Sequence, residues 1–177
     1  MRQHVLSLAK LLTQIKELYD PPLVMAEVGV ASGATSIHLF QQFPDLTMWL
    51  VDPYQDYNGA SADDMRELLR QALVNTQAYR DRRRFLIMES IEAAKLVPDG
   101  SLDLVFIDGT HTYDEVWQDI TAWWPKLKSG CGSIMSGHDY SRKFRGLKQA
   151  VNEWAEENGH ELGFLPNRVW WTMDHET

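Results

Sequence analysis

The sequence predicts a single doubly wound α/β domain across residues 1–177, with a mostly parallel sheet that ends in an antiparallel hairpin. Short apolar runs alternate five times with segments whose apolar residues recur at helical spacing, which is the order of a parallel sheet covered by helices. Two strand-like runs around Pro166-Asn167 then close the chain, and a turn that short allows only antiparallel pairing. A length of 177 residues is enough for one buried core.

The individual elements follow from the same signals in chain order. Helices are expected where apolar side chains recur every three to four residues between a polar cap, such as Ser61, and a breaker, such as Pro44 or Pro125. Strands are expected where short apolar runs lie between turn residues. The predicted helices cover 4–19, 34–43, 61–76, 91–97, 113–124 and 142–157, and the predicted strands cover 23–28, 46–51, 85–88, 102–107, 132–136, 160–165 and 168–173.

The amino-acid composition indicates which classes of partner to expect and in which compartment the chain is expected. A net charge of −8 and a pI near 5.2 argue against nucleic acid and against an anionic membrane surface. The single cysteine excludes an internal disulfide framework, and no apolar run approaches the roughly 20 residues of a membrane span. No signal-peptide pattern opens the chain, so a cytoplasmic location is expected. The basic run 82–84 is interpreted as a solvated helix end, and the oligomeric state, including a homo-oligomer, stays open.

A glycine-bounded loop after the first strand is the centre of the predicted site. Gly29 and Gly33 permit backbone angles that a Cβ disfavours, and the following helix offers free N–H groups above the loop. The loop is not a dinucleotide fingerprint, because Ala31 and Ala34 stand where its second and third glycines belong. A P-loop is excluded by the lack of a Gly-Lys-Ser/Thr sequence.

Polar residues gather where the predicted strands end. Ligands of such sheets bind outside the carboxyl ends of the strands. Taken singly, each of these residues is best explained as a solvated loop residue, but five polar strand ends together indicate a site. They are Glu27, Asp52, Glu89-Ser90, Asp108 and His138-Asp139.

The pattern favours a ligand that has an adenosine but no phosphates. Asp52 can accept hydrogen bonds from both hydroxyls of a ribose. An acidic rim also suits the ammonium and sulfonium charges of S-adenosylmethionine.

Five stretches carry a resemblance to a known family. They are residues 27–33 (EVGVASG), 50–53 (LVDP), 106–113 (FIDGTHTY), 124–130 (WPKLKSG) and 137–140 (GHDY). Along nearly its whole length, the sequence resembles a class I S-adenosylmethionine-dependent methyltransferase with a Rossmann-like sheet. The Ile-Asp-Gly-x-His-x-Tyr run with the later His-Asp-Tyr is similar to the small-molecule O-methyltransferases that include macrolide-sugar and rhamnosyl enzymes, and to cephalosporin hydroxylase-like proteins.

The resemblance implies roles for individual residues. Glu27, Gly29, Ser32 and Gly33 would surround the methionine part of S-adenosylmethionine, Asp52 would hold its ribose, and Glu89-Ser90 would lie beside its adenine. Asp108 would contribute both to the cofactor site and to catalysis. Asp108 and Asp139 match positions that bind a divalent ion such as Mg²⁺ in metal-dependent members, and His111 matches a proposed general base.

The expected reaction is methyl transfer to a hydroxyl of a small molecule. A metal can lower the pKa of that hydroxyl, and a histidine can take its proton. Where metal-dependent relatives often have an acidic residue, this chain has His138, which suits Mn²⁺ or Zn²⁺ better than Mg²⁺, so the need for a metal is left open. An alternative role for His111 is capping the helix near Tyr113.

Two other functions are compatible with the same residues. A metal-dependent hydrolase or hydroxylase would use Asp108, His111, His138 and Asp139 as ligands, and a silent binding module would hold the cofactor without turnover. A nicotinamide dehydrogenase is disfavoured by the glycine pattern. Tyr54, Tyr57 and Tyr140 are candidates for the acceptor pocket, whereas Trp123, Trp124, Trp170 and Trp171 are assigned to packing.

Overall fold

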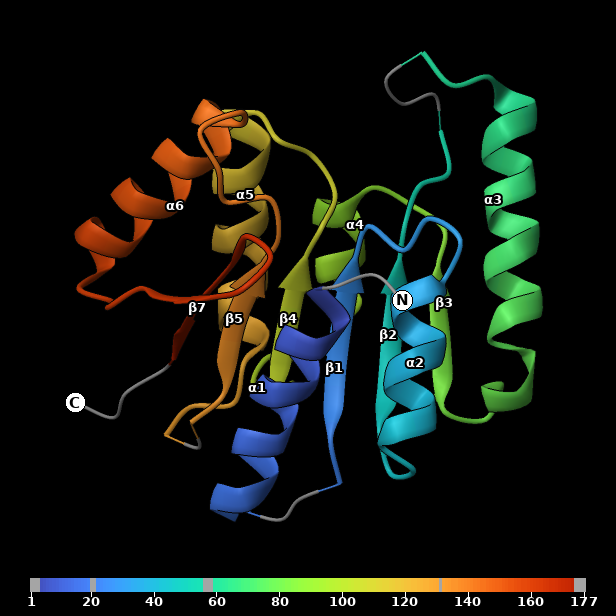
Figure 1. Cartoon of the computed structure of the whole chain (residues 1–177), viewed down its shortest axis with the longest axis horizontal. Coiled ribbons are helices and arrows are strands. Elements are labelled where there is room, and N and C mark those ends of the chain that lie inside the picture. The colour runs from blue at the N-terminus through green and yellow to red at the C-terminus, as the bar shows by residue number, and fades with distance from the viewer. Residues whose placement is uncertain (1–3, 20–21, 56–58, 131, 174–177) are drawn as a thin grey trace.

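A computed structural model describes residues 4–19, 22–55, 59–130 and 132–173, and these form one seven-stranded sheet with helices on both faces (Figure 1). The strands are β1 (Val24–Val28), β2 (Thr47–Val51), β3 (Arg83–Leu86), β4 (Leu104–Ile107), β5 (Ile134–Gly137), β6 (Gly163–Leu165) and β7 (Val169–Met173). The helices are α1 (His4–Tyr19), α2 (Ala34–Gln42), α3 (Ala62–Asn75), α4 (Ser90–Ala94), α5 (Tyr113–Trp123) and α6 (Arg145–Asn158), with short 3₁₀ turns at Gln77–Tyr79 and Trp124–Lys126.

The strand order is β3-β2-β1-β4-β5-β7-β6, which confirms the doubly wound sheet. Strands β1 to β5 pair in parallel, and β7 runs antiparallel to both β5 and β6, as the closing hairpin predicts. The order reverses between β1 and β4, so the carboxyl ends of these strands border the crevice where ligands bind in such sheets.

Two hydrophobic cores lie on opposite faces of the sheet. Side chains of α1 and α2 pack on one face, and those of α4, α5 and α6 pack on the other (Figure 1). Trp123 and Trp170 are fully buried in the second core, and Trp124 and Trp171 pack at the edges of the two cores, which confirms their assignment to packing. The central strand β4 is buried on both faces, as its almost wholly apolar sequence requires.

Helix α1 has an orientation that matters for the site. It packs on the sheet through Leu8, Leu11, Leu12 and Ile15, all at most 1% exposed. Figure 1 shows that it runs opposite to the parallel strands, so its first turn lies at their carboxyl ends. No helix among the described residues is long and apolar enough to cross a membrane.

The interpretation of the basic run 82–84 was wrong. Instead of ending a helix, it leads into the edge strand β3, which therefore begins two residues before its predicted start. Arg82 donates hydrogen bonds to the carbonyl oxygens of Phe43 and Leu46, and Arg84 lies over the ring of Trp49. Arginine can occupy a sheet edge because its aliphatic stem packs while its guanidinium binds backbone oxygens or aromatic rings.

Candidate active site

A cavity of about 200 Å³ lies at the carboxyl ends of β1, β2 and β4. Its walls combine apolar side chains with four carboxyl groups. The described residues that line it include Val28, Gly29, Ala31, Val51, Asp52, Tyr54, Met65, Leu68, Glu89, Ser90, Asp108 and Asp119. Asp52, Glu89, Ser90 and Asp108 were predicted from their positions at strand ends, and Gly29 was predicted from the glycine-bounded loop.

Gly29 brings the end of β1 against the end of β4. Its φ is +95°, and a Cβ at this position would lie 2.4 Å from the carbonyl oxygen of Asp108. Its N–H donates to the carbonyl oxygen of Val51 at the end of β2. Only glycine can therefore hold the three strand ends this close together.

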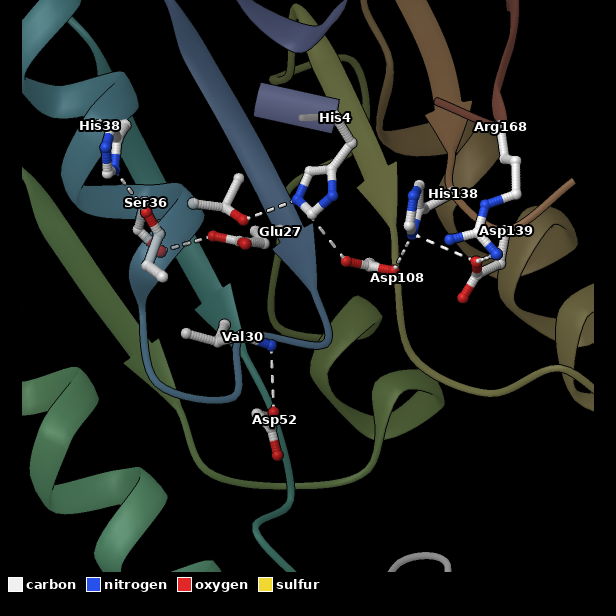
Figure 2. Close-up of polar contacts among 12 residues, drawn as sticks. His4, Glu27, Val30, Ser36, His38, Asp52, Asp108, His138, Asp139 and Arg168 are labelled. Atoms are coloured by element: carbon white, nitrogen blue, oxygen red, sulfur yellow. Dashed lines mark hydrogen bonds and ion pairs between the residues drawn. The ribbon is translucent and has the colours of Figure 1, made fainter. Parts of the chain in front are cut away.

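The carboxylate of Asp52 shapes the loop after β1. Its Oδ2 accepts a hydrogen bond from the backbone N–H of Val30 (Figure 2). Oδ2 also accepts one from the backbone N–H of Ala31, and Oδ1 accepts one from the backbone N–H of Tyr54. A carboxylate has about four acceptor positions, so these three bonds leave one. Asp52 can accept both hydroxyls of a ribose only if one backbone N–H, such as that of Tyr54, gives up its bond.

Tyr54 forms a wall of the cavity. Its hydroxyl donates a hydrogen bond to the carbonyl oxygen of Ala31 at 3.0 Å, and this bond ties the segment after β2 to the loop after β1. Burial, followed by the charges of Asp52 and Glu27, raises the pKa of the Tyr54 hydroxyl above its ordinary value. The side chain therefore acts as a neutral hydrogen-bond donor at neutral pH. Tyr57 lies outside the described residues.

Glu27, Ser32 and Gly33 do not line the cavity among the described residues. Glu27 is 1% exposed and accepts a 2.5 Å hydrogen bond from Ser36 of α2. Gly33 has a φ of +72°, and a Cβ there would lie 3.2 Å from the Cα of Ala72 in α3. These residues hold the loop and its helix against the rest of the fold.

The cavity lining also contains a buried acid that the sequence did not single out. Asp119 of α5 lines the cavity and is 5% exposed. Burial raises its pKa to about 6, although a hydrogen bond with Ser90 acts in the opposite direction. Ser90 also accepts a hydrogen bond from the indole of Trp123, so its orientation is set from both sides. Asp119 lies at helical spacing with the apolar residues Val116 and Ile120, and this spacing was the sequence signal that its carboxyl group is on the buried face of α5.

A second group of polar side chains forms a chain across the ends of β4 and β5 (Figure 2). His138 Nδ1 lies 3.1 Å from Asp108 Oδ1 and 3.6 Å from Asp139 Oδ1. Asp139 Oδ2 is 2.9 Å from His111 Nε2, and Asp139 Oδ1 is 3.0 Å from the Arg168 guanidinium. The structure thus brings together all four residues that the sequence predicted here.

Burial disfavours the charged form of His138, but the hydrogen bond to Asp108 and the nearby carboxylates outweigh it, so the pKa of His138 is raised. His111 does not cap α5. The cap is Thr112, whose side chain accepts from the Glu115 N–H, and His111 instead stacks on Phe144 with ring centroids 3.9 Å apart.

Three residues of this group were missed by sequence reasoning. His4 from α1 and Arg168 from the β6–β7 turn reach Asp108 and Asp139 from opposite ends of the chain. Phe144 orients His111 from the turn before α6. The hydroxyl of Tyr140, a candidate for the acceptor pocket, donates a hydrogen bond to Asn152 of α6.

Comparisons with known proteins place this geometry in a family. Residues 26–140 match the family model described as a methyltransferase domain. An uncharacterized protein, y4gI of Sinorhizobium fredii, is 27% identical over 128 residues, which are 72% of this chain and 13% of that protein. The chain therefore spans about an eighth of the length of this curated relative.

Solved structures share the fold at low sequence identity. The O-methyltransferase NovP is 19% identical with a TM-score of 0.73, over 96% of this chain and 80% of NovP. CalS11, a TDP-rhamnose 3'-O-methyltransferase of calicheamicin biosynthesis, is 19% identical with a TM-score of 0.69, over 97% and 81%. With the family match over most of its length, this chain belongs to the methyltransferase domain family, and its fold is that of the class I S-adenosylmethionine-dependent methyltransferases.

Proposed function

We propose that this chain transfers the methyl group of S-adenosylmethionine to a hydroxyl of a small molecule. The observation that carries the proposal is the pair His111 Nε2–Asp139 Oδ2, at 2.9 Å, beside the carboxyl ends of β4 and β5. The structurally similar proteins NovP and CalS11 are O-methyltransferases, and CalS11 acts on the sugar nucleotide TDP-rhamnose. These similarities support the acceptor class.

The residues that line the cavity suit the chemistry of the cofactor. Apolar walls from Val28, Met65 and Leu68 suit a purine, and Gly29 lines the cavity at the end of β1. Asp52 would take a ribose hydroxyl, and Ser90 with Asp119 would lie at the purine end. S-adenosylmethionine, when bound, supplies an electrophilic methyl group on a sulfonium ion.

The tautomer of His111 follows from its partner. A carboxylate only accepts hydrogen bonds, so the Asp139 contact requires the proton to be on Nε2 of the neutral ring. Nδ1 is then the nitrogen that can take a proton from an acceptor hydroxyl. Asp139 holds the ring and stabilises the imidazolium that forms, and Phe144 fixes the plane of the ring.

The proposal is tested by turnover on a panel of hydroxylated acceptors that includes nucleotide-linked deoxysugars and phenols. S-adenosylhomocysteine release and an acceptor heavier by one methyl substitution are expected with at least one acceptor. The variant His111→Gln should lose this activity, and His38→Gln, which changes a histidine bonded within α2, should keep it. Tight binding of S-adenosylhomocysteine without turnover on the whole panel would contradict the proposal and favour the silent binding module.

A further inference from the structure

His4 of α1 reaches the carboxyl edge of the sheet although it lies at the opposite end of the chain from β5. The side chain is buried, and Figure 2 shows it facing Asp108. Its Nε2 lies 3.0 Å from Thr35 Oγ1 and 4.0 Å from Asp108 Oδ2. Its ring centroid is 4.5 Å from that of His138, so two imidazoles flank one carboxylate.

These three side chains have the spacing of ligands around one ion. One nitrogen or oxygen from each of His4, Asp108 and His138 lies within 4.8 Å of the others. Two ligands bonded at about 2.1 Å to a tetrahedral ion are about 3.4 Å apart, so binding would draw the widest-spaced of these atoms together by about 1 Å. The apolar packing of α1 holds His4 in this place without the ion.

Asp139 is a poor candidate for the same ion. Its Oδ1 is 3.0 Å from the guanidinium of Arg168, and its Oδ2 is 2.9 Å from His111. The arginine already neutralises this carboxylate and would repel a divalent cation. The available ligands are therefore two imidazoles and one carboxylate, a set that shares Asp108 and His138 with the site predicted from the sequence and has His4 in place of Asp139.

We propose that His4, Asp108 and His138 form a binding site for a divalent transition metal of the zinc type, in which His4 is a ligand and Asp139 is not. Imidazole favours Zn²⁺ and the later transition metals, whereas Mg²⁺ favours oxygen ligands. Two histidines and one carboxylate leave coordination positions open, and Asp108 also lines the cavity. The N-terminal helix then becomes part of the site.

The test measures metal binding in the absence of cofactor and acceptor, so its failure leaves the proposed methyl transfer untouched. The full chain is treated with a chelator and titrated calorimetrically with Zn²⁺ and with Mg²⁺. One equivalent of Zn²⁺ is expected to bind, with Mg²⁺ at least about 100-fold weaker. Equal affinity for the two ions would overturn the assignment of nitrogen ligands.

Three variants locate the ligands. His4→Gln should weaken Zn²⁺ binding by at least about 100-fold, because a ligand is lost, whereas Asp139→Asn should cost about tenfold or less. His38→Gln is the matched control, because His38 bonds to the Ala34 carbonyl within α2 and should leave the affinity unchanged. Unchanged Zn²⁺ affinity in His4→Gln, or a loss in His38→Gln as large as that in His4→Gln, would overturn the proposal.

A measurement on the unmodified chain covers the case in which His4→Gln fails to fold. Co²⁺ bound at two imidazoles and a carboxylate should give the strong visible absorption of a four- or five-coordinate ion. The weak spectrum of an octahedral, oxygen-ligated ion would overturn the proposal. Zn²⁺ should also slow hydrogen exchange of the α1 amides, and exchange at an unchanged rate would show that α1 supplies no ligand.

Discussion

The two halves of the candidate site are built in different ways. The cofactor half, around Gly29 and Asp52, is made by backbone groups and side chains at the carboxyl ends of neighbouring strands. The acceptor half, around Asp108 and Asp139, depends on His4 and Arg168, which come from the two ends of the chain. The first half is fixed by strand ends and one glycine, and the second by tertiary packing of distant segments.

This difference predicts which property of the protein a substitution in each half should affect. A substitution in the cofactor half alters backbone geometry and should affect stability and cofactor binding together. A substitution in the acceptor half alters side chains on an intact frame and should affect chemistry or metal binding alone. Stability, cofactor affinity, turnover and metal affinity can be measured separately, so the two kinds of effect can be told apart.

The largest effect is expected for His111→Gln. Loss of a general base typically lowers the rate about 100- to 10,000-fold, and kcat should fall within this range. The affinity for S-adenosylhomocysteine should not change, because His111 is not among the described residues that line the cavity. A loss of that affinity comparable with the loss of kcat would show that the two halves are not separate.

Gly29→Ala should break the cofactor half through the backbone. The new Cβ would lie 2.4 Å from the Asp108 carbonyl oxygen, and the φ of +95° adds strain. The expected cost is about 3 kcal/mol or more in the free energy of unfolding, measured in urea. Gly100→Ala is the control, because its φ of +63° is also positive but nothing lies near its Cβ, so it should cost about 1 kcal/mol. Equal costs would refute the close contact at Gly29.

Asp119 should make stability depend on pH. Its folded pKa of about 6 lies above the ordinary 3.8, so the folded state binds its proton more tightly than the unfolded state does. Its contribution is complete below about pH 4 and is lost as pH rises through 6, which amounts to roughly 3 kcal/mol. Asp119→Asn should lack this decrease, and urea unfolding from pH 4 to 8 measures it. An identical pH profile in the variant would contradict the raised pKa.

The smallest effect on stability is expected for Arg168→Gln. Its side chain is half exposed, so the ion pair with Asp139 should contribute less than about 1 kcal/mol. Removing the guanidinium should nevertheless raise the affinity for Mg²⁺, since Asp139 Oδ1 no longer faces a cation. Arg145→Gln, at the exposed start of α6, is the control and should leave Mg²⁺ affinity unchanged. Equal Mg²⁺ binding in both variants would show that Arg168 does not exclude the ion.

The same contrast explains what the sequence could predict. The sheet, its helices and the polar strand ends follow from periodicity and turn residues, so Gly29, Asp52 and Asp108 were found where the structure has them lining the cavity. A sequence pattern carries no signal for a contact between His4 and Asp108, because it depends on how α1 packs. The start of β3 was missed because an arginine run gives no apolar signal at a sheet edge.

The most direct test of the account is a calorimetric titration of S-adenosylhomocysteine into the unmodified chain, Asp52→Asn and His111→Gln. The account predicts micromolar binding to the unmodified chain, a clear loss of affinity in Asp52→Asn and unchanged affinity in His111→Gln. Absence of binding to the unmodified chain would contradict the cofactor site at the carboxyl ends of β1 and β2. Equal losses in both variants would contradict the division of the site into a cofactor half and an acceptor half.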